Sequence, residues 1–106
     1  MKIDERVKFE ETYINEDYGT TTHYFTIEKS LLEELYPNKY PEACGGEISV
    51  EFPTDCHEAR VADVCISPTE YDEENDTYMD YDWNDVSLPY EEIEALFDMV
   101  NNKEDK

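Results

Sequence analysis

The sequence predicts an α+β fold: one compact domain in which an antiparallel sheet of about five strands carries two short helices, in the order ββαβββα. Three observations lead to this prediction. A chain of 106 residues can bury a single core. Five segments alternate apolar and polar residues as strands do, and two carry apolar residues at helical spacing. Short turns favour antiparallel pairing, with one or both helices on one face of the sheet.

The first two strands are expected to form a hairpin. Within residues 2–14, most apolar side chains occupy odd-numbered positions, which indicates a half-buried strand. These residues are Ile3, Val7, Phe9 and Tyr13. A turn follows at NEDYGT, residues 15–20, where Gly19 can adopt a positive φ. The chain then returns through the β-branched and aromatic segment TTHYFTIE, residues 21–28.

A short helix comes next, within SLLEELYP at residues 30–37. Ser30 and Glu33 have the spacing of a capping box, in which each side chain bonds the other residue's backbone N–H. Pro37 makes continuation beyond residue 36 unfavourable. The apolar face of this helix consists of Leu31, Leu32, Leu35 and Tyr36.

Two strands are expected in the middle of the chain. We expect a loop with two adjacent glycines at NKYPEACGG, residues 38–46, leading into the alternating strand EISVEF, residues 47–52. After the turn PTDCHEA comes the apolar strand RVADVCIS, residues 60–67. Pro68 ends that strand or confines it to a sheet edge, because proline cannot donate to the ladder.

The last strand and the last helix complete the domain. Residues 77–86 alternate again, so we expect one set of side chains to face the core, Met79, Tyr81 and Trp83, and the other to face solvent, Asp80 and Asp82. The helix begins near Pro89, with Glu91 and Glu92 at the positive end of its dipole, and its buried stripe is Ile93, Leu96, Phe97 and Val100. We assign residues 1–102 to the domain and 103–106 to a frayed tail.

Charge is the strongest compositional feature. The formal net charge is −21, from 29 acids and eight bases, and residues 61–102 contain thirteen acids and no Lys or Arg. Such a balance disfavours nucleic acid and anionic membranes as partners and favours cations, basic peptides or the basic grooves of other proteins. No apolar run follows Met1, and the cysteine count of three is odd. We therefore expect a cytoplasmic protein with reduced thiols and no signal peptide.

Metal and catalytic signatures are weak. The acidic stretch from Asp72 lacks the glycine and the closing glutamate of an EF-hand, which leaves an irregular, weak divalent-cation site at Asp72, Glu74 and Asp76 as an alternative. The three cysteines do not match a zinc module, and we predict no cofactor. His23 and His57 are expected to face solvent or cap backbone groups. No nucleophile, base or phosphate-binding loop is recognisable, so we predict that the protein is not an enzyme.

An acidic surface with interspersed tyrosines remains the candidate binding site. On one strand, Asp80 and Asp82 would lie roughly 6.6 Å apart, a separation similar to that of neighbouring phosphates. On the last helix, like charges at helical spacing cost roughly 0.2–0.5 kcal/mol per pair, so they do not favour folding. We predict that this surface binds a partner through Glu70, Asp72, Glu73, Glu74, Asp76, Tyr78, Asp80, Asp82 and Asp85, with Glu91, Glu94 and Asp98 as an extension.

The chain contains stretches rich in acids and tyrosine, such as EYDEENDTYMDYDWND at residues 70–85. In these stretches, and in its size, α+β organisation and acidity, it resembles the small acidic inhibitors of mobile elements, of the anti-CRISPR and anti-restriction type. The resemblance is one of overall profile, so no family residue is carried over. It implies a DNA mimic that occupies the nucleic-acid groove of a nuclease or CRISPR effector, its carboxylates standing where phosphates stand. An immunity protein or antitoxin that neutralises a basic toxin would need the same acidic face.

Overall fold

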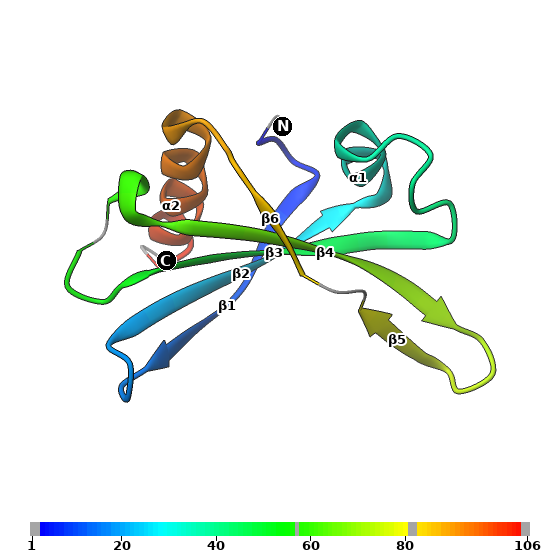
Figure 1. Ribbon diagram of the computed structural model, residues 1–106, viewed down its shortest axis with the longest axis horizontal. Coiled ribbons are helices and arrows are strands. Elements are labelled where there is room, and N and C mark those ends of the chain that lie inside the picture. Colours follow the sequence, from blue (N-terminus) through cyan, green and yellow to red (C-terminus); the bar gives the residue numbers. More distant parts are fainter. Residues whose placement is uncertain (1–2, 57, 81–82, 105–106) are drawn as a thin grey trace.

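The computed structural model describes residues 3–56, 58–80 and 83–104, and in this part of the chain the predicted α+β class and element order are confirmed. Five antiparallel strands lie in the spatial order β1–β2–β3–β4–β5, and β6 pairs with β4 beside β5 (Figure 1). Both helices lie on the same side of the sheet. The elements are β1 (Val7–Asn15), β2 (Thr20–Glu28), α1 (Lys29–Leu35), β3 (Ala43–Pro53), a 3-10 turn (Ala59–Val61), β4 (Asp63–Asp72), β5 (Thr77–Asp80), β6 (Asn84–Val86) and α2 (Tyr90–Glu104).

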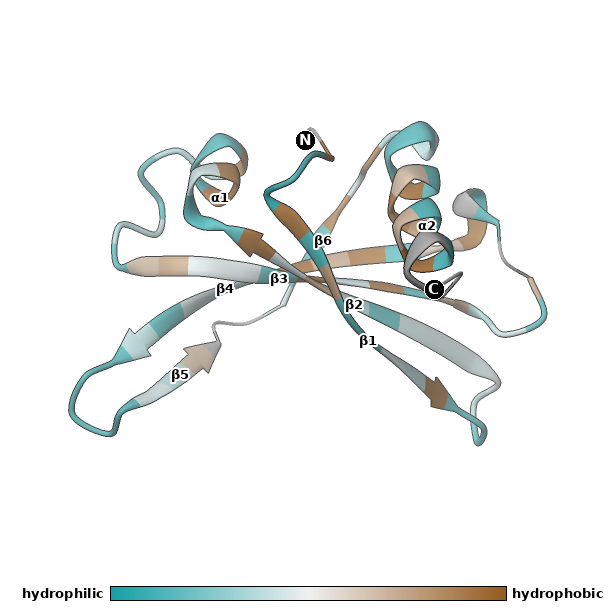
Figure 2. Cartoon of the chain, turned by 180° about the vertical axis from the view of Figure 1, so that it is seen from behind, coloured by the Kyte–Doolittle hydropathy of each residue, from teal (hydrophilic) through white to brown (hydrophobic). Residues whose placement is uncertain are grey.

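The core fills the space between the sheet and the two helices. Hydrophobic and hydrophilic residues alternate along parts of the central strands (Figure 2), and the buried ones belong to the core. Burying one such side chain contributes about 1.5–3 kcal/mol. The buried apolar residues from these strands and helices are Phe25, Ile27, Leu31, Leu32, Ile48, Val50, Phe52, Val64, Ile66, Ile93, Leu96 and Val100.

The third strand begins earlier than predicted. Residues 43–46 belong to β3 and not to a loop, and Gly45 and Gly46 pair with β2 and β4 inside the sheet. A Cβ atom on Gly45 would lie 2.7 Å from the backbone oxygen of Ile27, and one on Gly46 would lie 3.0 Å from that of Ser67. The two glycines therefore permit close approach of neighbouring backbone and do not mark a turn. Gly19, with φ of +65°, does take the predicted turn conformation.

A β-bulge changes the first strand. The register with β2 shifts between Phe9 and Glu11, so Glu10 is the additional residue. Val7 and Phe9 before the bulge pack on the core, as predicted, but Tyr13 beyond it is 56% exposed. One additional residue moves every following side chain of the strand to the other face of the sheet. Tyr13 was predicted to face the core and therefore lies on the side away from it.

The helices agree with the prediction in position but not in capping. The first helix starts at Lys29, and its N-cap residue, Glu28, makes no side-chain capping bond, so the capping box predicted from Ser30 is wrong. An ion pair links this helix to the segment before β1: Arg6 Nη1 lies 2.8 Å from Glu34 Oε2. The second helix has the predicted buried stripe and runs to Glu104, into the segment assigned to the tail.

The predicted last strand is divided into β5 and β6, which pair with different halves of β4. Met79 is 57% exposed and Trp83 is 42% exposed, so their predicted burial is wrong. The β4–β5 hairpin extends beyond both helices (Figure 1), and none of the described helices covers β5 there. Tyr81 and Asp82 lie outside the described residues.

Candidate protein-binding surface

In the part of the chain that the structure describes, the side of the sheet that faces away from α1 and α2 carries no helix (Figures 1 and 2). We call it the free face. Strand alternation and register place on it the side chains that do not point into the core. Its central residues are Glu11, Thr22, Tyr24, Glu47, Ser49, Glu51, Asp63, Cys65 and Asp85.

Two cross-strand rows organise the free face. One row crosses five strands through the paired residues Glu11, Tyr24, Ser49, Cys65 and Asp85. In the neighbouring row, Glu51 of β3 is directly opposite Asp63 of β4, and both side chains are exposed. Like charges directly opposite each other on adjacent strands are destabilising. The sheet therefore holds two carboxylates side by side at a cost in folding free energy.

The ionisable groups between these carboxylates respond to burial and to negative charge. Burial raises the pKa of the Tyr24 hydroxyl, and Glu11, Glu51 and Glu47 raise it further. Burial, a hydrogen bond from Sγ to Asp85 Oδ1 of 3.2 Å, and the charge of Asp63 raise the pKa of Cys65 to about 11. Both side chains consequently remain neutral at physiological pH, amid a set of carboxylates.

A pocket of about 200 Å³ opens on the free face. Tyr24 and Trp83 form an aromatic wall, with ring centroids 6.4 Å apart and planes inclined by 56°. Glu51 and Asp63 line the same pocket. The remaining lining residues are Thr22, Ser49 and Cys65. The pocket thus combines two aromatic rings with two carboxylates.

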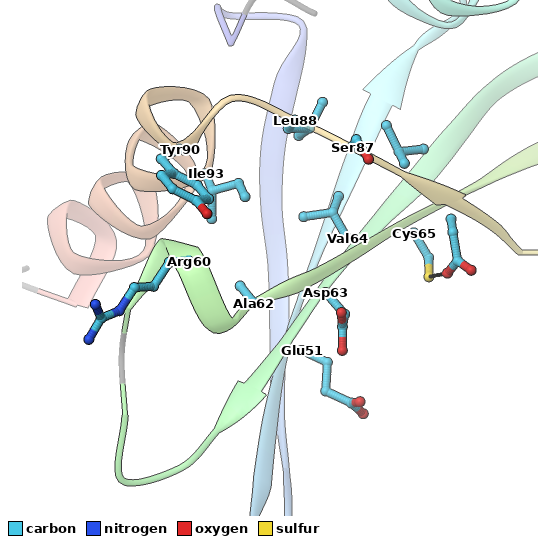
Figure 3. A pocket seen from close by; sticks show the side chains of 12 residues that line it. Glu51, Arg60, Ala62, Asp63, Val64, Cys65, Ser87, Leu88, Tyr90 and Ile93 are labelled. Carbon is cyan, nitrogen blue, oxygen red and sulfur yellow. Dashed lines mark hydrogen bonds between the residues drawn. The ribbon is translucent and has the colours of Figure 1, made fainter.

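A larger pocket of about 800 Å³ adjoins the first, and Glu51, Asp63 and Cys65 line both. Figure 3 shows Leu88 and Val64 along its apolar side, with Tyr90 and Ile93 contributed by α2. The side chains of Glu51 and Asp63 point away from that apolar side. A ligand that lies across both pockets would meet negative charge at one end and apolar side chains at the other.

The β4–β5 hairpin, residues 70–80, is the second acidic surface, and we call it the acidic hairpin. Asp72 Oδ1 accepts the backbone N–H of Glu74 at 3.0 Å, and its Oδ2 accepts the Asn75 amide at 2.7 Å. The Asn75 bond is the main cause that lowers the pKa of Asp72. The Tyr71 hydroxyl donates to Asp76, and this bond raises the pKa of Tyr71. Asp72 and Asp76, two of the carboxylates predicted to contact the partner, therefore accept hydrogen bonds within the hairpin itself.

The hairpin also presents aromatic surface. Tyr71 and Tyr78 are direct cross-strand neighbours with ring centroids 5.2 Å apart, and they are 40% and 68% exposed. By the alternation of β4, Tyr71 lies on the same face of the strand as Cys65. The free face thus continues into the tyrosine-bearing side of the acidic hairpin.

The predicted site residues divide into three groups. The acidic hairpin brings together Glu70, Asp72, Glu73, Glu74, Asp76 and Tyr78, and Asp85 lies on the free face. Asp80 ends β5, its side chain is outside the description, and Asp82 lies outside the described residues. The acids of α2 lie on the opposite side of the sheet, toward the other end of the long axis from β5 (Figure 1), and do not extend the hairpin surface: Glu91, Glu94 and Asp98.

Several residues of the free face were not predicted as site residues. Glu47 and Glu51 alternate with buried residues of one strand, so the sequence does indicate that they share a face. Glu11, Asp63 and Trp83 join them only through the strand order and the register. These relations require long-range pairing, which the local pattern does not contain.

His23 lies in the core, and the described side chains form no cluster that could hold a metal ion. His23 is 7% exposed and contacts the rings of Phe52 and Phe97, so its predicted solvent exposure is wrong. Its Nδ1 lies 2.8 Å from Thr12 Oγ1. His57 lies outside the described residues. Within residues 3–56, 58–80 and 83–104, no group of three His, Cys, Asp or Glu side chains is arranged to hold a metal ion.

None of the helices in the described ranges has the length and apolar character needed to cross a membrane. No protein-family model, curated protein or solved structure is significantly similar to the chain. The functional interpretation therefore depends on the geometry of the free face and the acidic hairpin.

Proposed function

We propose that this protein is a non-enzymatic inhibitor that binds a basic nucleic-acid-binding protein and occupies its nucleic-acid groove as a DNA mimic, in the manner of anti-CRISPR and anti-restriction inhibitors. It would act in the cytoplasm of the cell that contains the target. The observation that carries the proposal is the free face, where Glu51 and Asp63 lie side by side beside the exposed ring of Trp83. Such an arrangement lowers stability and suits a positively charged partner.

The positions of the two arginines support the same conclusion. Lys8 of β1 does lie on the free face, opposite Thr26 and in line with Glu47, but outside the two rows described above. Among the described residues, Arg6 forms ion pairs with Asp4 and Glu34, and Arg60 forms one with Glu58. These pairs lie outside the two rows of the free face. The carboxylates of those rows are therefore not neutralised by the arginines that the structure describes. A partner that brings Lys or Arg would remove their mutual repulsion on binding.

The dimensions of the free face suit a nucleic-acid groove. Adjacent strands lie ~4.8 Å apart, so the row from Glu11 to Asp85 spans roughly 19 Å across the sheet. This width allows several carboxylates to contact cationic side chains that otherwise bind successive phosphates. The exposed rings of Tyr71, Tyr78 and Trp83 add contact area that charge alone does not provide.

An immunity protein or antitoxin would use the same electrostatics against a basic toxin, and the identity of the bound partner separates the two. The immobilised protein is exposed to a bacterial lysate that contains CRISPR and restriction systems, and retained proteins are identified by mass spectrometry. We expect a nuclease or effector that retains no activity on its nucleic acid once bound. Retention of a toxin that does not bind nucleic acid would favour the immunity function instead.

A pair of charge-reversed variants tests the assigned surface. Glu51→Lys/Asp63→Lys changes the free face, and Glu91→Lys/Glu94→Lys makes the same change in net charge on α2. We expect the first variant to lose the partner and the second to retain it, because only the free face is assigned to the contact. Equal retention by the two variants would show that the surface has been misassigned.

A further inference from the structure

We propose that the pocket between Tyr24 and Trp83 is a binding site for an arginine side chain of the partner. This inference rests on the proposed function and makes its recognition chemistry specific: the partner places one guanidinium group against the aromatic wall and between Glu51 and Asp63. The pocket residues come from β2, β3, β4 and the segment that enters β6. Six of the seven lining residues thus lie in paired strands, and Trp83 directly precedes β6.

The aromatic wall favours a planar cation. A cation within about 6 Å of a tryptophan or tyrosine ring centroid is attracted by the ring quadrupole, and tryptophan gives the strongest attraction. Tyr24 and Trp83 are inclined to each other at 56°, with centroids 6.4 Å apart, so a group in the pocket can contact both rings. The Tyr24 hydroxyl, whose pKa is raised, remains a neutral hydrogen-bonding group.

The two carboxylates favour arginine over lysine. A guanidinium group presents five N–H donors in a fixed plane and can bind carboxylates in pairs while it stacks on an aromatic ring, whereas an ammonium group is a compact point charge. Glu51 and Asp63 are cross-strand neighbours, and both are exposed. One guanidinium group can therefore contact both carboxylates and offset their repulsion.

The arginine of this chain nearest to the pocket does not occupy it. Arg60 lines the adjoining larger pocket, but its side chain points away from Glu51 and Asp63 (Figure 3). Its Nε lies 2.5 Å from Glu58 Oε2. The described residues that line the smaller pocket include no Lys or Arg. An arginine from outside the chain is thus the ligand whose shape and charge complement the site.

Trp83 makes the inference measurable, because it is the single tryptophan of the chain. The probe is the blocked peptide acetyl-Gly-Arg-Gly-amide, titrated against the full chain at low salt while tryptophan emission is recorded. We expect saturable binding, about fivefold weaker binding of the lysine peptide, and no saturable binding of the citrulline peptide, which has the shape of arginine without its charge. Equal affinity for the arginine and citrulline peptides would overturn the proposal.

Matched variants locate the binding. Glu51→Gln/Asp63→Asn removes both pocket carboxylates, and Glu91→Gln/Glu94→Gln removes the same charge from α2, on the other side of the sheet. We expect the first variant to lose binding by about tenfold or more and the second to change it by less than about twofold. Equal weakening by both variants would mean that the peptide responds to net charge and not to the pocket.

The two proposals fail in distinguishable ways. If the protein retains a nuclease or effector but Trp83 does not report the arginine peptide, the proposed function stands and the arginine site is wrong. If Trp83 reports the peptide but no nucleic-acid-binding protein is retained, the site exists and the proposed partner class is wrong.

Discussion

Cys65 illustrates how a single residue adapts to an acidic surface. Its thiol lies on the free face and donates to Asp85 Oδ1 at 3.2 Å, and burial and this bond raise its pKa to about 11 from an ordinary value of 9.0. Deprotonation would place a third negative charge beside Asp85 and Asp63. The fold therefore favours the protonated thiol, which makes Cys65 a weak nucleophile.

We predict slow alkylation of Cys65 in the folded protein. In the variant Cys44→Ser/Cys56→Ser, the rate with iodoacetamide at pH 8 should be at least about tenfold lower in the folded state than in urea, because fewer thiolates are present. The rate should continue to rise with pH up to about 11. Since the folded-state pKa is raised, the stability that this protonated thiol contributes is lost as pH increases from 9.0 toward 11. Equal folded and unfolded rates would contradict this account.

At the scale of elements, α2 illustrates how one helix covers its side of the sheet. Leu96 is fully buried, and Ile93 and Val100 lie beside it on the same stripe. Phe97 of the same helix packs edge-on against Phe52 of β3, with ring centroids 5.2 Å apart. Glu91, Glu94 and Asp98 of α2 are exposed on the remaining surface of the helix, which explains why they are separated from the free face.

Leu96→Ala should destabilise the protein by about 2–5 kcal/mol, because it removes a buried side chain and leaves a cavity. The matched control Glu94→Ala changes an exposed residue of the same helix and should change the free energy of unfolding by less than about 0.5 kcal/mol. Urea denaturation followed by circular dichroism measures both values. Similar losses in the two variants would show that α2 is held by its solvent-exposed charges and not by its apolar stripe.

Local patterns were sufficient to predict the existence and order of the main elements. The alternation around Ile48 and the helical stripe around Leu96 are properties of neighbouring residues, and both were confirmed. The bulge at Glu10, the close approach at Gly45 and the division of the last strand depend on the partner strand. A pattern confined to one segment does not specify these relations.

The candidate site was only partly predictable for the same reason. The acidic hairpin is contiguous, so its acids were identified from composition. The exposure of Trp83 and the burial of His23 were both predicted wrongly. In each case the outcome depends on which face of the sheet the helices cover. Alternation along a strand shows which side chains share a face, but it does not show which of the two faces is buried.

At the scale of the whole molecule, charge opposes folding. The chain has a formal net charge of −21, and its Cα atoms have a radius of gyration of 14.1 Å. Fields between exposed charges decay over about 8 Å at physiological ionic strength, so many of these acids repel one another. Stability should therefore depend on screening more than it does in a protein of balanced charge.

We predict that the melting temperature rises as NaCl increases from about 10 mM to about 500 mM, because salt screens this repulsion. Glu51→Gln/Asp63→Asn should show a smaller rise, since it removes one opposed pair of carboxylates. Differential scanning calorimetry on both proteins provides the comparison. A melting temperature that is unchanged or lower at high salt would show that self-repulsion does not limit stability.

The central claim is that this acidic surface takes the place of nucleic acid on a basic partner, and competition tests it most directly. The partner retained from the lysate is bound to the immobilised protein, and duplex DNA or RNA of the kind that the partner binds is added in increasing amounts. The account predicts that nucleic acid displaces the partner completely and that the affinity of the partner for this protein falls steeply with salt. A stable complex in which the partner holds this protein and nucleic acid at the same time would contradict it.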